Sequence, residues 1–210
     1  MPRKHCLIFV HLKKPLLLVF CKNPILGKAK TRLAASIGEE KALEIYHALL
    51  QKTALVLFDV DVDIQLYYSS HIDHDDIFQK PSITKKIQTG NDLGIRMANA
   101  FKEGFKSYSP IVIIGTDLWT LDVFDIHKAF EALQTSGTVI GPSADGGYYL
   151  LGLQKFIPAL FENKKWGTPT VLSNSLNDLK KEDVYLLEEK NDIDTYGDLT
   201  AHPELMQLLK

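Results

Sequence analysis

The chain has 210 residues, 45% of them hydrophobic, so it can bury one substantial core and has the usual size of a single α/β domain. Its 24 Lys and Arg side chains nearly balance 26 Asp and Glu, which argues against a nucleic-acid-binding surface. Cys6 and Cys21 are too few for a disulfide framework or a four-cysteine zinc site, and we therefore expect a cytoplasmic protein.

The first residues resemble the start of a signal peptide, because Arg3 and Lys4 precede an apolar run at residues 7–10. Polar residues interrupt that run soon afterwards, and no small-residue cleavage site follows. We interpret residues 1–14 as an irregular extension and residues 15–210 as one domain. The chain has no apolar stretch of about 18 residues, so we expect no membrane span.

The first half of the chain alternates strand and helix patterns. Residues 16–20 are an unbroken apolar run, typical of a strand buried on both faces. A helix is predicted from residue 39 to about residue 58, since apolar side chains recur there at helical spacing. Strands are predicted at 64–68 and 85–88, followed by a helix that Asn91 can cap. That helix carries four apolar residues on one face, namely Leu93, Met97, Phe101 and Phe105.

The second half continues this alternation. Pro110 ends the preceding helix, and residues 111–114 are the strongest candidate for a buried strand. The other predicted elements are a helix from about 123, strands at 139–140, 148–153 and 184–187, a helix opened by Thr168 and Pro169, and a last helix from about Tyr196. This order predicts a three-layer α/β/α sandwich with a mixed, mostly parallel sheet. Ligands of such sheets bind beyond the carboxyl ends of the strands, hence after Phe20, Ile114 and Ile140.

The segment that follows the first predicted strand is rich in positive charge. Its cations are Lys22, Lys28, Lys30 and Arg32. Gly27 permits a tight turn and a close approach of the backbone to a ligand. The segment can therefore hold a diphosphate, although it has neither the Walker spacing nor the dinucleotide glycine fingerprint. A solvated basic turn is the structural alternative.

Two further loops follow predicted strands. Asp117 lies at the end of the strongest strand, where a carboxylate can coordinate Mg²⁺ or Mn²⁺ that bridges two phosphates, although it can also cap the next helix. In the third loop, Gly146 and Gly147 let the chain pass close to a ligand, Asp145 can bind or deprotonate a hydroxyl, and Tyr148 can present a flat wall. An ordinary hairpin turn is the alternative for this Asp-Gly-Gly sequence.

Several polar or aromatic residues support alternative interpretations. The His- and Asp-rich residues 71–76 have no regular metal-ligand spacing and are predicted to form a surface loop. Trp166 can stack on a sugar or a nucleobase, or it can pack in the core. Of the three aspartates near the C-terminus, Asp192, Asp194 and Asp198, we select Asp194 as a candidate ligand and expect Asp198 to serve the start of the last helix.

Six short motifs occur in a fixed order along the chain. They are Lys22-x-Pro24-x-x-Gly27-x-x-Lys30-Thr31-Arg32-Leu33, Gly90-x-Asp92-Leu93-Gly94-x-Arg96-Met97, Ile114-Gly115-Thr116-Asp117, Gly141-Pro142-x-x-Asp145-Gly146-Gly147-Tyr148-Tyr149-Leu150-x-Gly152-Leu153, Trp166-x-Thr168 and Asp192-x-Asp194-Thr195-x-x-Asp198-Leu199. Together they resemble the bacterial radical-SAM/selenodomain-associated transferases, over about Leu16 to Leu199. Two positions depart from that family's usual pattern, Trp119 in place of Pro and Gly167 in place of Ser.

This resemblance implies the GT-A fold of nucleotide-diphospho-sugar transferases, which the molybdenum-cofactor and coenzyme-F420 guanylyltransferases share more distantly. It implies Lys30 and Arg32 as phosphate ligands, Asp117 as a metal ligand and Asp194 as a second metal ligand. The other predicted substrate contacts are Lys22, Gly27, Asp92, Gly146, Gly147, Tyr148 and Trp166.

Three functions are compatible with these residues. The leading one is a glycosyltransferase for a nucleotide sugar, with Mg²⁺ or Mn²⁺ held by Asp117 and Asp194 and with Asp145 as the base or orienting group for an acceptor hydroxyl. A nucleotidyltransferase acting on a nucleoside triphosphate and a phosphorylated acceptor would use the same parts. A catalytically inactive binding module is the third, although such a module has no physical need for clustered cations and carboxylates at one sheet edge.

Overall fold

The computed structural model describes residues 13–209, in which the strands form one seven-stranded sheet with the order β3-β2-β1-β4-β6-β5-β7. The strands are β1 Lys14–Cys21, β2 Asp63–Tyr68, β3 Ile83–Ile87, β4 Tyr108–Ile114, β5 Thr138–Pro142, β6 Tyr148–Leu153 and β7 Val184–Leu186. β6 runs antiparallel to β4 and β5, and the other pairs in the described range are parallel. The predicted mixed, mostly parallel sheet is confirmed.

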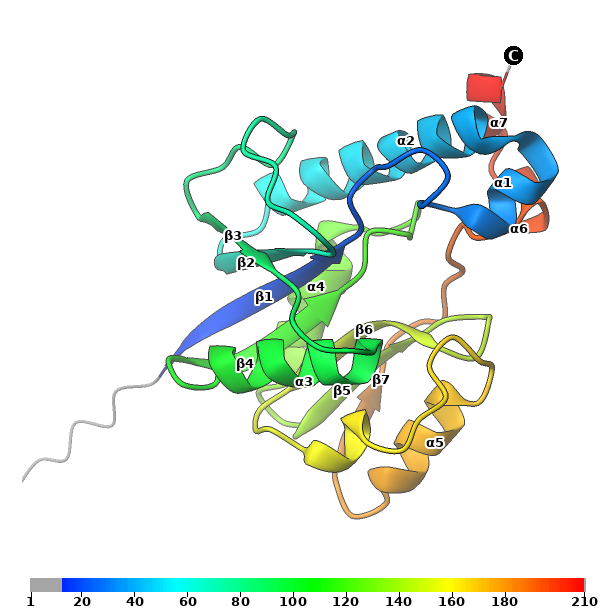
Figure 1. The fold of residues 1–210 in the computed structure, drawn as a ribbon. Coiled ribbons are helices and arrows are strands. Elements are labelled where there is room, and N and C mark those ends of the chain that lie inside the picture. Colours follow the sequence, from blue (N-terminus) through cyan, green and yellow to red (C-terminus); the bar gives the residue numbers. More distant parts are fainter. Residues whose placement is uncertain (1–12, 210) are drawn as a thin grey trace, which may run out of the picture.

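Helices cover both faces of this sheet (Figure 1). They are α1 Thr31–Ile37, α2 Glu39–Phe58, α3 Leu93–Gly104, α4 Val123–Ala132, α5 Val171–Asp178, α6 Tyr196–Thr200 and α7 Pro203–Met206, with 3-10 helices η1 Pro158–Phe161 and η2 Gln207–Leu209. One hydrophobic core joins the sheet to α2 and α4, and the other joins it to α3, η1 and α5. The described part of the chain therefore has the three predicted layers, and none of its helices is long and apolar enough to cross a membrane.

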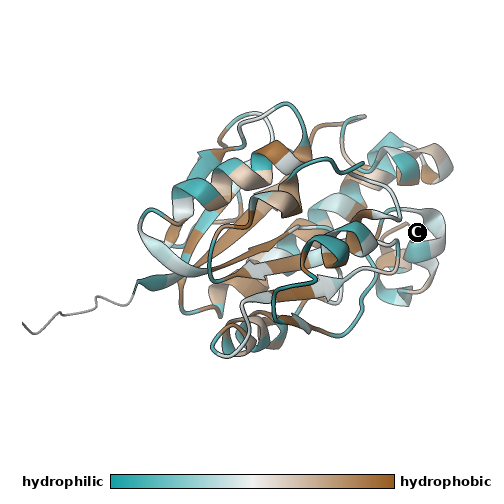
Figure 2. Cartoon of the chain, turned by 90° about the horizontal axis from the view of Figure 1, so that it is seen from below, coloured by the Kyte–Doolittle hydropathy of each residue, from teal (hydrophilic) through white to brown (hydrophobic). Residues whose placement is uncertain are grey.

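The unbroken apolar sequence of β1 is explained by its central position. Leu17 and Val19 pack in the core on the α2 side, whereas Leu16 and Leu18 pack in the core on the α3 side, and all four are inaccessible to solvent. Successive strand residues point to opposite faces, so a strand covered on both sides needs apolar residues at every position. Figure 2 shows the resulting hydrophobic sheet between more hydrophilic helix surfaces.

The order of the strands places a crevice beside β1. From β1 the chain adds β2 and then β3 on one side, and it returns to place β4 on the other side of β1. At such a reversal the connections leave in opposite directions and open a crevice at the carboxyl ends of the two strands. The segment after β1 and the Gly115–Asp117 segment after β4 therefore meet at one edge of the sheet.

Most predicted elements are confirmed, but several boundaries are wrong. β1 begins at Lys14, so the predicted extension of residues 1–14 overlaps the first strand, and residues 1–12 lie outside the described range. No helix was predicted before residue 39, yet α1 lies there, because a helix of seven residues is too short for its periodicity to be visible. Pro110 lies inside β4, and α3 has already ended at Gly104.

Two predicted helix caps are also wrong by one or two residues. Asp92, not Asn91, caps α3, because its Oδ1 accepts a hydrogen bond of 2.8 Å from the backbone N of Ile95. α5 begins at Val171, so Thr168 and Pro169 precede the helix instead of opening it. Both errors come from neighbouring residues with the same capping propensity, between which local sequence does not discriminate.

Candidate active site

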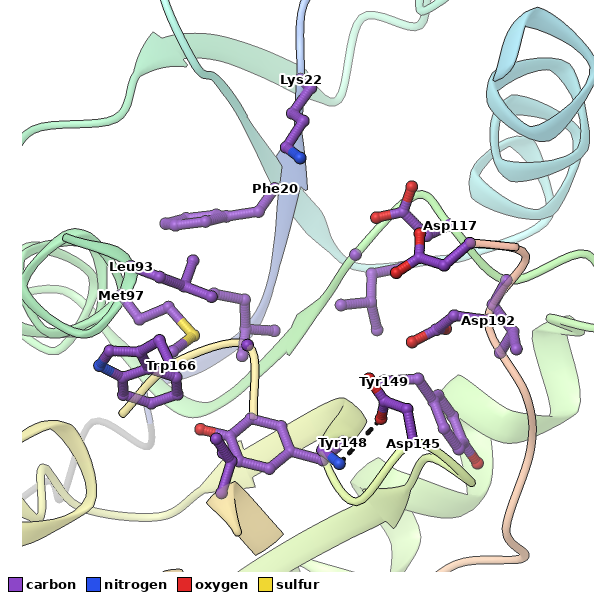
Figure 3. Close-up of a pocket in the computed structure, with 18 of the residues that line it drawn as sticks. Phe20, Lys22, Leu93, Met97, Asp117, Asp145, Tyr148, Tyr149, Trp166 and Asp192 are labelled. Carbon is purple, nitrogen blue, oxygen red and sulfur yellow. Dashed lines mark hydrogen bonds between the residues drawn. The ribbon is translucent and has the colours of Figure 1, made fainter. Parts of the chain in front are cut away.

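A cavity of about 540 Å³ lies at the carboxyl ends of β1 and β4 (Figure 3). Its volume falls in the range of small-molecule sites, which is about 300–1,000 Å³. One wall carries charge, from Lys22, Arg32, Asp117, Asp145, Asp192 and Asp194. The opposite wall is apolar and aromatic, from Phe20, Leu93, Met97, Tyr148 and Trp166. The cavity can therefore receive a ligand with one ionic end and one flat or apolar end.

A chain of ion pairs runs along the charged wall. The ammonium of Lys30 lies 2.5 Å from Oδ1 of Asp117 and 3.0 Å from Oδ1 of Asp194. Arg32 pairs with the other oxygen of Asp194. The cationic turn after β1 and the carboxylate after β4 are thus joined directly by the Lys30–Asp117 pair. Asp194, which lies 164 residues from Lys30 in the sequence, joins the same cluster.

The local backbone at Lys30 directs its side chain beneath the carboxylates. Lys30 has φ 51° and ψ 43° and occupies the position before α1. A left-handed conformation costs a residue with a Cβ about 1–2 kcal/mol, so the ion pairs must offset it. Burial alone would lower the pKa of Lys30, but Asp117 and Asp194 outweigh that effect and raise it. Lys30 is therefore a permanent cation, and its side chain is only 3% exposed.

Tyr46 of α2 holds the two strand ends together. Its hydroxyl donates to the carbonyl of Lys22 at 2.8 Å, accepts from the backbone N of Lys22 at 3.1 Å and lies 3.2 Å from Oγ1 of Thr116. Burial raises its pKa above the ordinary value, so the phenol stays neutral. Tyr46 cannot be identified from the sequence alone, since an aromatic residue on an apolar helix face predicts only a core position.

Cys21 lines the cavity but is not a candidate nucleophile. Burial raises the pKa of its thiol to about 12, and the nearby carboxylate of Asp117 adds to that effect. Because the thiolate is the reactive form, Cys21 stays an inert thiol at neutral pH.

Asp192 also lines the cavity, although it was not among the predicted ligands. Ser143 donates a hydrogen bond of 3.2 Å to its Oδ2. Burial raises the pKa of Asp192 to about 7, Asp117 contributes in the same direction, and Lys30 opposes them. The sequence signal was the position of Asp192 at the start of the sixth motif, two residues before Asp194.

The raised pKa of Asp192 predicts that the contribution of this group to folding stability falls as pH rises. An unfolded aspartate ionises near pH 3.9, whereas the folded chain keeps this proton until about pH 7. Stability is therefore highest below about pH 4 for this group and decreases through the window up to about pH 7, by an amount on the order of a few kcal/mol. Asp192→Asn should remove this slope in urea unfolding with a chelator present, and an unchanged slope would contradict the assignment.

The third predicted loop is both a hairpin turn and a wall of the cavity. It connects β5 to antiparallel β6, and Oδ1 of Asp145 accepts a hydrogen bond of 2.8 Å from the backbone N of Gly147, drawn dashed in Figure 3. Asp145, Gly147 and Tyr148 line the cavity. The two interpretations of this loop are therefore compatible, because an exposed turn at the strand edge can present a carboxylate to a ligand.

Four predicted contact residues do not line the cavity. Asp92 caps α3, and Gly27 lies in the turn before α1 with φ 73°. The carbonyl of Gly146 instead accepts a hydrogen bond of 2.9 Å from the backbone N of Leu172. Lys30 lies beneath Asp117 and Asp194, so it touches the carboxylates and not the open space.

Trp166 does line the cavity, and its placement explains Gly94 of the second motif. A Cβ at position 94 would lie 2.3 Å from Nε1 of Trp166, so only glycine leaves room for the indole. The ring meets Tyr148 edge-on, with centroids 6.4 Å apart. Of the two positions that depart from the family pattern, Gly167 lines the cavity beside Trp166. Trp119 packs against the core, and its Nε1 donates a hydrogen bond to Glu204 of α7.

The two predicted metal ligands have suitable donor chemistry for a hard divalent cation. Asp117 and Asp194 reach the cavity with side chains that are 40% and 31% exposed, and in the described chain Oδ2 of Asp117 has no hydrogen bond or ion pair. Within residues 13–209 no three His, Cys, Asp or Glu side chains group closely enough to hold a metal ion. A pair of carboxylates fits a cation whose other ligands are substrate oxygens or water.

Solved structures with a similar fold include a proposed nucleotide-diphospho-sugar transferase and a cytidylyltransferase. A proposed nucleotide-diphospho-sugar transferase from Desulfovibrio desulfuricans G20 is 28% identical, with 94% of this chain and 99% of that chain covered and a TM-score of 0.81. A cytidylyltransferase from Leptospira borgpetersenii is 16% identical, with 89% and 83% covered and a TM-score of 0.58. A Mycobacterium tuberculosis H37Rv protein in complex with manganese is 12% identical, with 90% and 97% covered and a TM-score of 0.51.

Sequence comparison supplies the family. No curated protein matches the chain. A family model described as "Uncharacterized protein conserved in bacteria (DUF2064)" matches residues 53–168, just over half of the 210 residues. The matched segment contains Asp117, Asp145 and Trp166, three residues that line the cavity. The chain is therefore a member of this bacterial DUF2064 family.

Proposed function

We propose that this protein is a metal-dependent transferase for a nucleoside-diphosphate-linked substrate, most simply a glycosyltransferase that uses a nucleotide sugar. The carrying observation is that Lys22 and Arg32 line the same cavity as Asp117, Asp145 and Asp194. Cations for phosphate and carboxylates for a metal and a hydroxyl are the parts that such a transfer needs. The resemblance of the six motifs to the radical-SAM/selenodomain-associated transferases supports the same function.

Each charged residue then has a specific task. Lys22 and Arg32 bind the diphosphate. The oxygen of the acceptor hydroxyl bonds to the sugar while the bond from the sugar to the diphosphate breaks, and Asp145 accepts the proton of that hydroxyl. Mg²⁺ or Mn²⁺ held by Asp117 and Asp194 would supply positive charge to the departing diphosphate. The aromatic wall of Tyr148 and Trp166 can stack on a flat ring of the substrate and exclude water.

A nucleotidyltransferase is the second candidate, and the fold shared with a cytidylyltransferase favours it. In that reaction a phosphate oxygen of the acceptor bonds to the α-phosphorus of a nucleoside triphosphate, and pyrophosphate leaves. The guanylyltransferases, which the motifs resemble more distantly, carry out reactions of this class. The cations and carboxylates of the cavity would serve both reactions, so the released product distinguishes them.

The decisive experiment supplies Mn²⁺ with a panel of nucleotide sugars and, separately, nucleoside triphosphates with sugar phosphates. Release of a nucleoside diphosphate supports glycosyl transfer, and release of pyrophosphate supports nucleotidyl transfer. Calorimetry on the same panel reports binding without an acceptor. Absence of nucleotide binding with and without Mn²⁺ would contradict both reactions and favour a catalytically inactive module.

Removal of the exposed phosphate-binding cation should weaken nucleotide binding. Arg32→Gln is expected to reduce affinity for a nucleoside diphosphate about tenfold, because a charged hydrogen bond contributes about 1.5–3 kcal/mol and this side chain is 64% exposed. Lys28→Met is the matched control, since Lys28 is an exposed cation of the same turn outside the cavity. Equal losses of affinity in both variants would mean that the general positive charge of the turn attracts the nucleotide and that Arg32 makes no specific contact.

A further inference from the structure

The feature that carries a further inference is the cation already present between the two candidate metal ligands. Lys30 bridges Asp117 and Asp194 at 2.5 Å and 3.0 Å. Both oxygens of Asp194 are engaged, Oδ1 by Lys30 and Oδ2 by Arg32. A divalent cation that binds Asp194 therefore meets an oxygen that is already paired with a positive charge.

The two paired cations differ in how deeply they lie. The Lys30 side chain is 3% exposed, whereas that of Arg32 is 64% exposed. Lys30 also touches both carboxylates, and its ammonium lies 5.9 Å from the ring centroid of Tyr46. A divalent cation near Asp117 and Asp194 is thus repelled chiefly by Lys30, because like charges at such short range repel strongly in a poorly hydrated place.

The same burial makes it costly to leave Lys30 without a partner. An ammonium that loses its carboxylates in a nearly dry place needs a new anion, since burial of an unpaired charge is strongly unfavourable. A diphosphate that enters with the metal supplies that anion. Lys30 has a flexible four-carbon chain, so its ammonium can move toward the cavity without a change in the backbone.

We propose that Lys30 is an exchangeable counter-ion, which a divalent cation displaces from Asp117 and Asp194 and which then pairs with the diphosphate that arrives with the cation. The inference rests on the proposed diphosphate ligand. The exchange makes the binding of metal and diphosphate interdependent. The metal alone would leave the Lys30 ammonium without an anionic partner, and the diphosphate alone would compete with two carboxylates for it. The structure pairs Lys30 with two carboxylates. The motif resemblance implies that Lys30 binds phosphate, and the exchange accounts for both.

The test compares two inorganic probes, Mn²⁺ alone and the preformed Mn²⁺–pyrophosphate complex, by calorimetry on wild-type protein and Lys30→Met. The variant should bind Mn²⁺ alone at least tenfold more tightly, because the competing cation is gone. Its preference for the pyrophosphate complex over Mn²⁺ alone should fall at least tenfold, because the anion loses its partner. Lys28→Met, which removes a cation of the same turn, should change both quantities less than threefold.

Two outcomes would overturn the proposal. Weaker or unchanged Mn²⁺ binding by Lys30→Met would show that Lys30 orients the carboxylates and does not compete for them. An unchanged preference for the pyrophosphate complex would show that Lys30 does not reach phosphate. Lys30→Gln also removes the charge but keeps a polar side chain, so it should repeat both results if Lys30→Met folds poorly. Lys30→Arg keeps the charge and should bind Mn²⁺ alone within threefold of wild type. No nucleotide is used, so failure to bind nucleotide sugars would contradict the proposed function and leave this exchange standing.

Discussion

Asp117→Asn should reduce metal-dependent nucleotide binding by about a hundredfold or more while the protein stays folded. The substitution keeps the shape of the side chain but removes the charge that would hold Mn²⁺, and a metal contributes several kcal/mol to charge stabilisation at such sites. The side chain is 40% exposed and lies at the end of β4, outside the cores, so little packing is lost. Lys30 keeps Asp194 as a partner at 3.0 Å.

The measurement is a nucleoside diphosphate titration with and without Mn²⁺, alongside a thermal melt. Asp61→Asn is the control, since Asp61 is an exposed aspartate before β2 and lies outside the cavity. It should leave both the affinity and the melting temperature unchanged. If Asp117→Asn keeps full Mn²⁺-dependent binding, the metal does not bind at the carboxyl end of β4.

Gly146→Ala should destabilise the protein by about 2–4 kcal/mol, the largest expected effect on folding. Gly146 has φ 84°, and a Cβ there would lie 2.3 Å from the carbonyl oxygen of Pro169. The left-handed conformation costs about 1 kcal/mol for alanine, and the clash with rigid backbone adds about 1–3 kcal/mol. The clash would separate the β5–β6 turn from the start of α5, and it would displace Asp145 as well.

Urea unfolding provides the test, and Gly167→Ala separates the two contributions. Gly167 also has positive φ, 75°, but a Cβ there would meet nothing within 4 Å. It should therefore lose only the conformational part, about 1 kcal/mol. Similar losses at both positions would mean that the close approach to Pro169 contributes nothing.

The order of elements was predictable because its signals are local. The unbroken apolar runs of β1 and β4 and the helical spacing of α2 are properties of a few consecutive residues, and packing in two cores requires them. α1 escaped prediction since its seven residues show one buried position, Leu33, and no repeat. The start of α5 was misplaced because Thr168 and Pro169 have the residue types of a helix start two residues before the helix begins.

The sequence predicted which loops form the candidate site, but it did not predict which side chains contact one another there. A strand-end rule and a motif sufficed to select Asp117, Asp145 and Arg32, which share the cavity. They did not reveal that Asp192 is half-buried with its pKa raised to about 7, because the surroundings of its carboxylate depend on Ser143 and other residues distant in the sequence. Asp92 and Gly146 belong to the motifs but have structural roles. Asp92 caps α3, and Gly146 lets the β5–β6 turn approach the backbone of Pro169 before α5.

The layer architecture, the mostly parallel sheet and the sheet edge at which the cavity lies could be inferred from the sequence, because the hydrophobic period and the order of elements along the chain are properties of neighbouring residues. Only the tertiary structure decided which charges touch. Lys30 and Asp194 are 164 residues apart, and their ion pair exists because the chain from β7 to α6 returns beneath the turn after β1. Long-range pairing depends on the folded path of the whole chain, which no local pattern records.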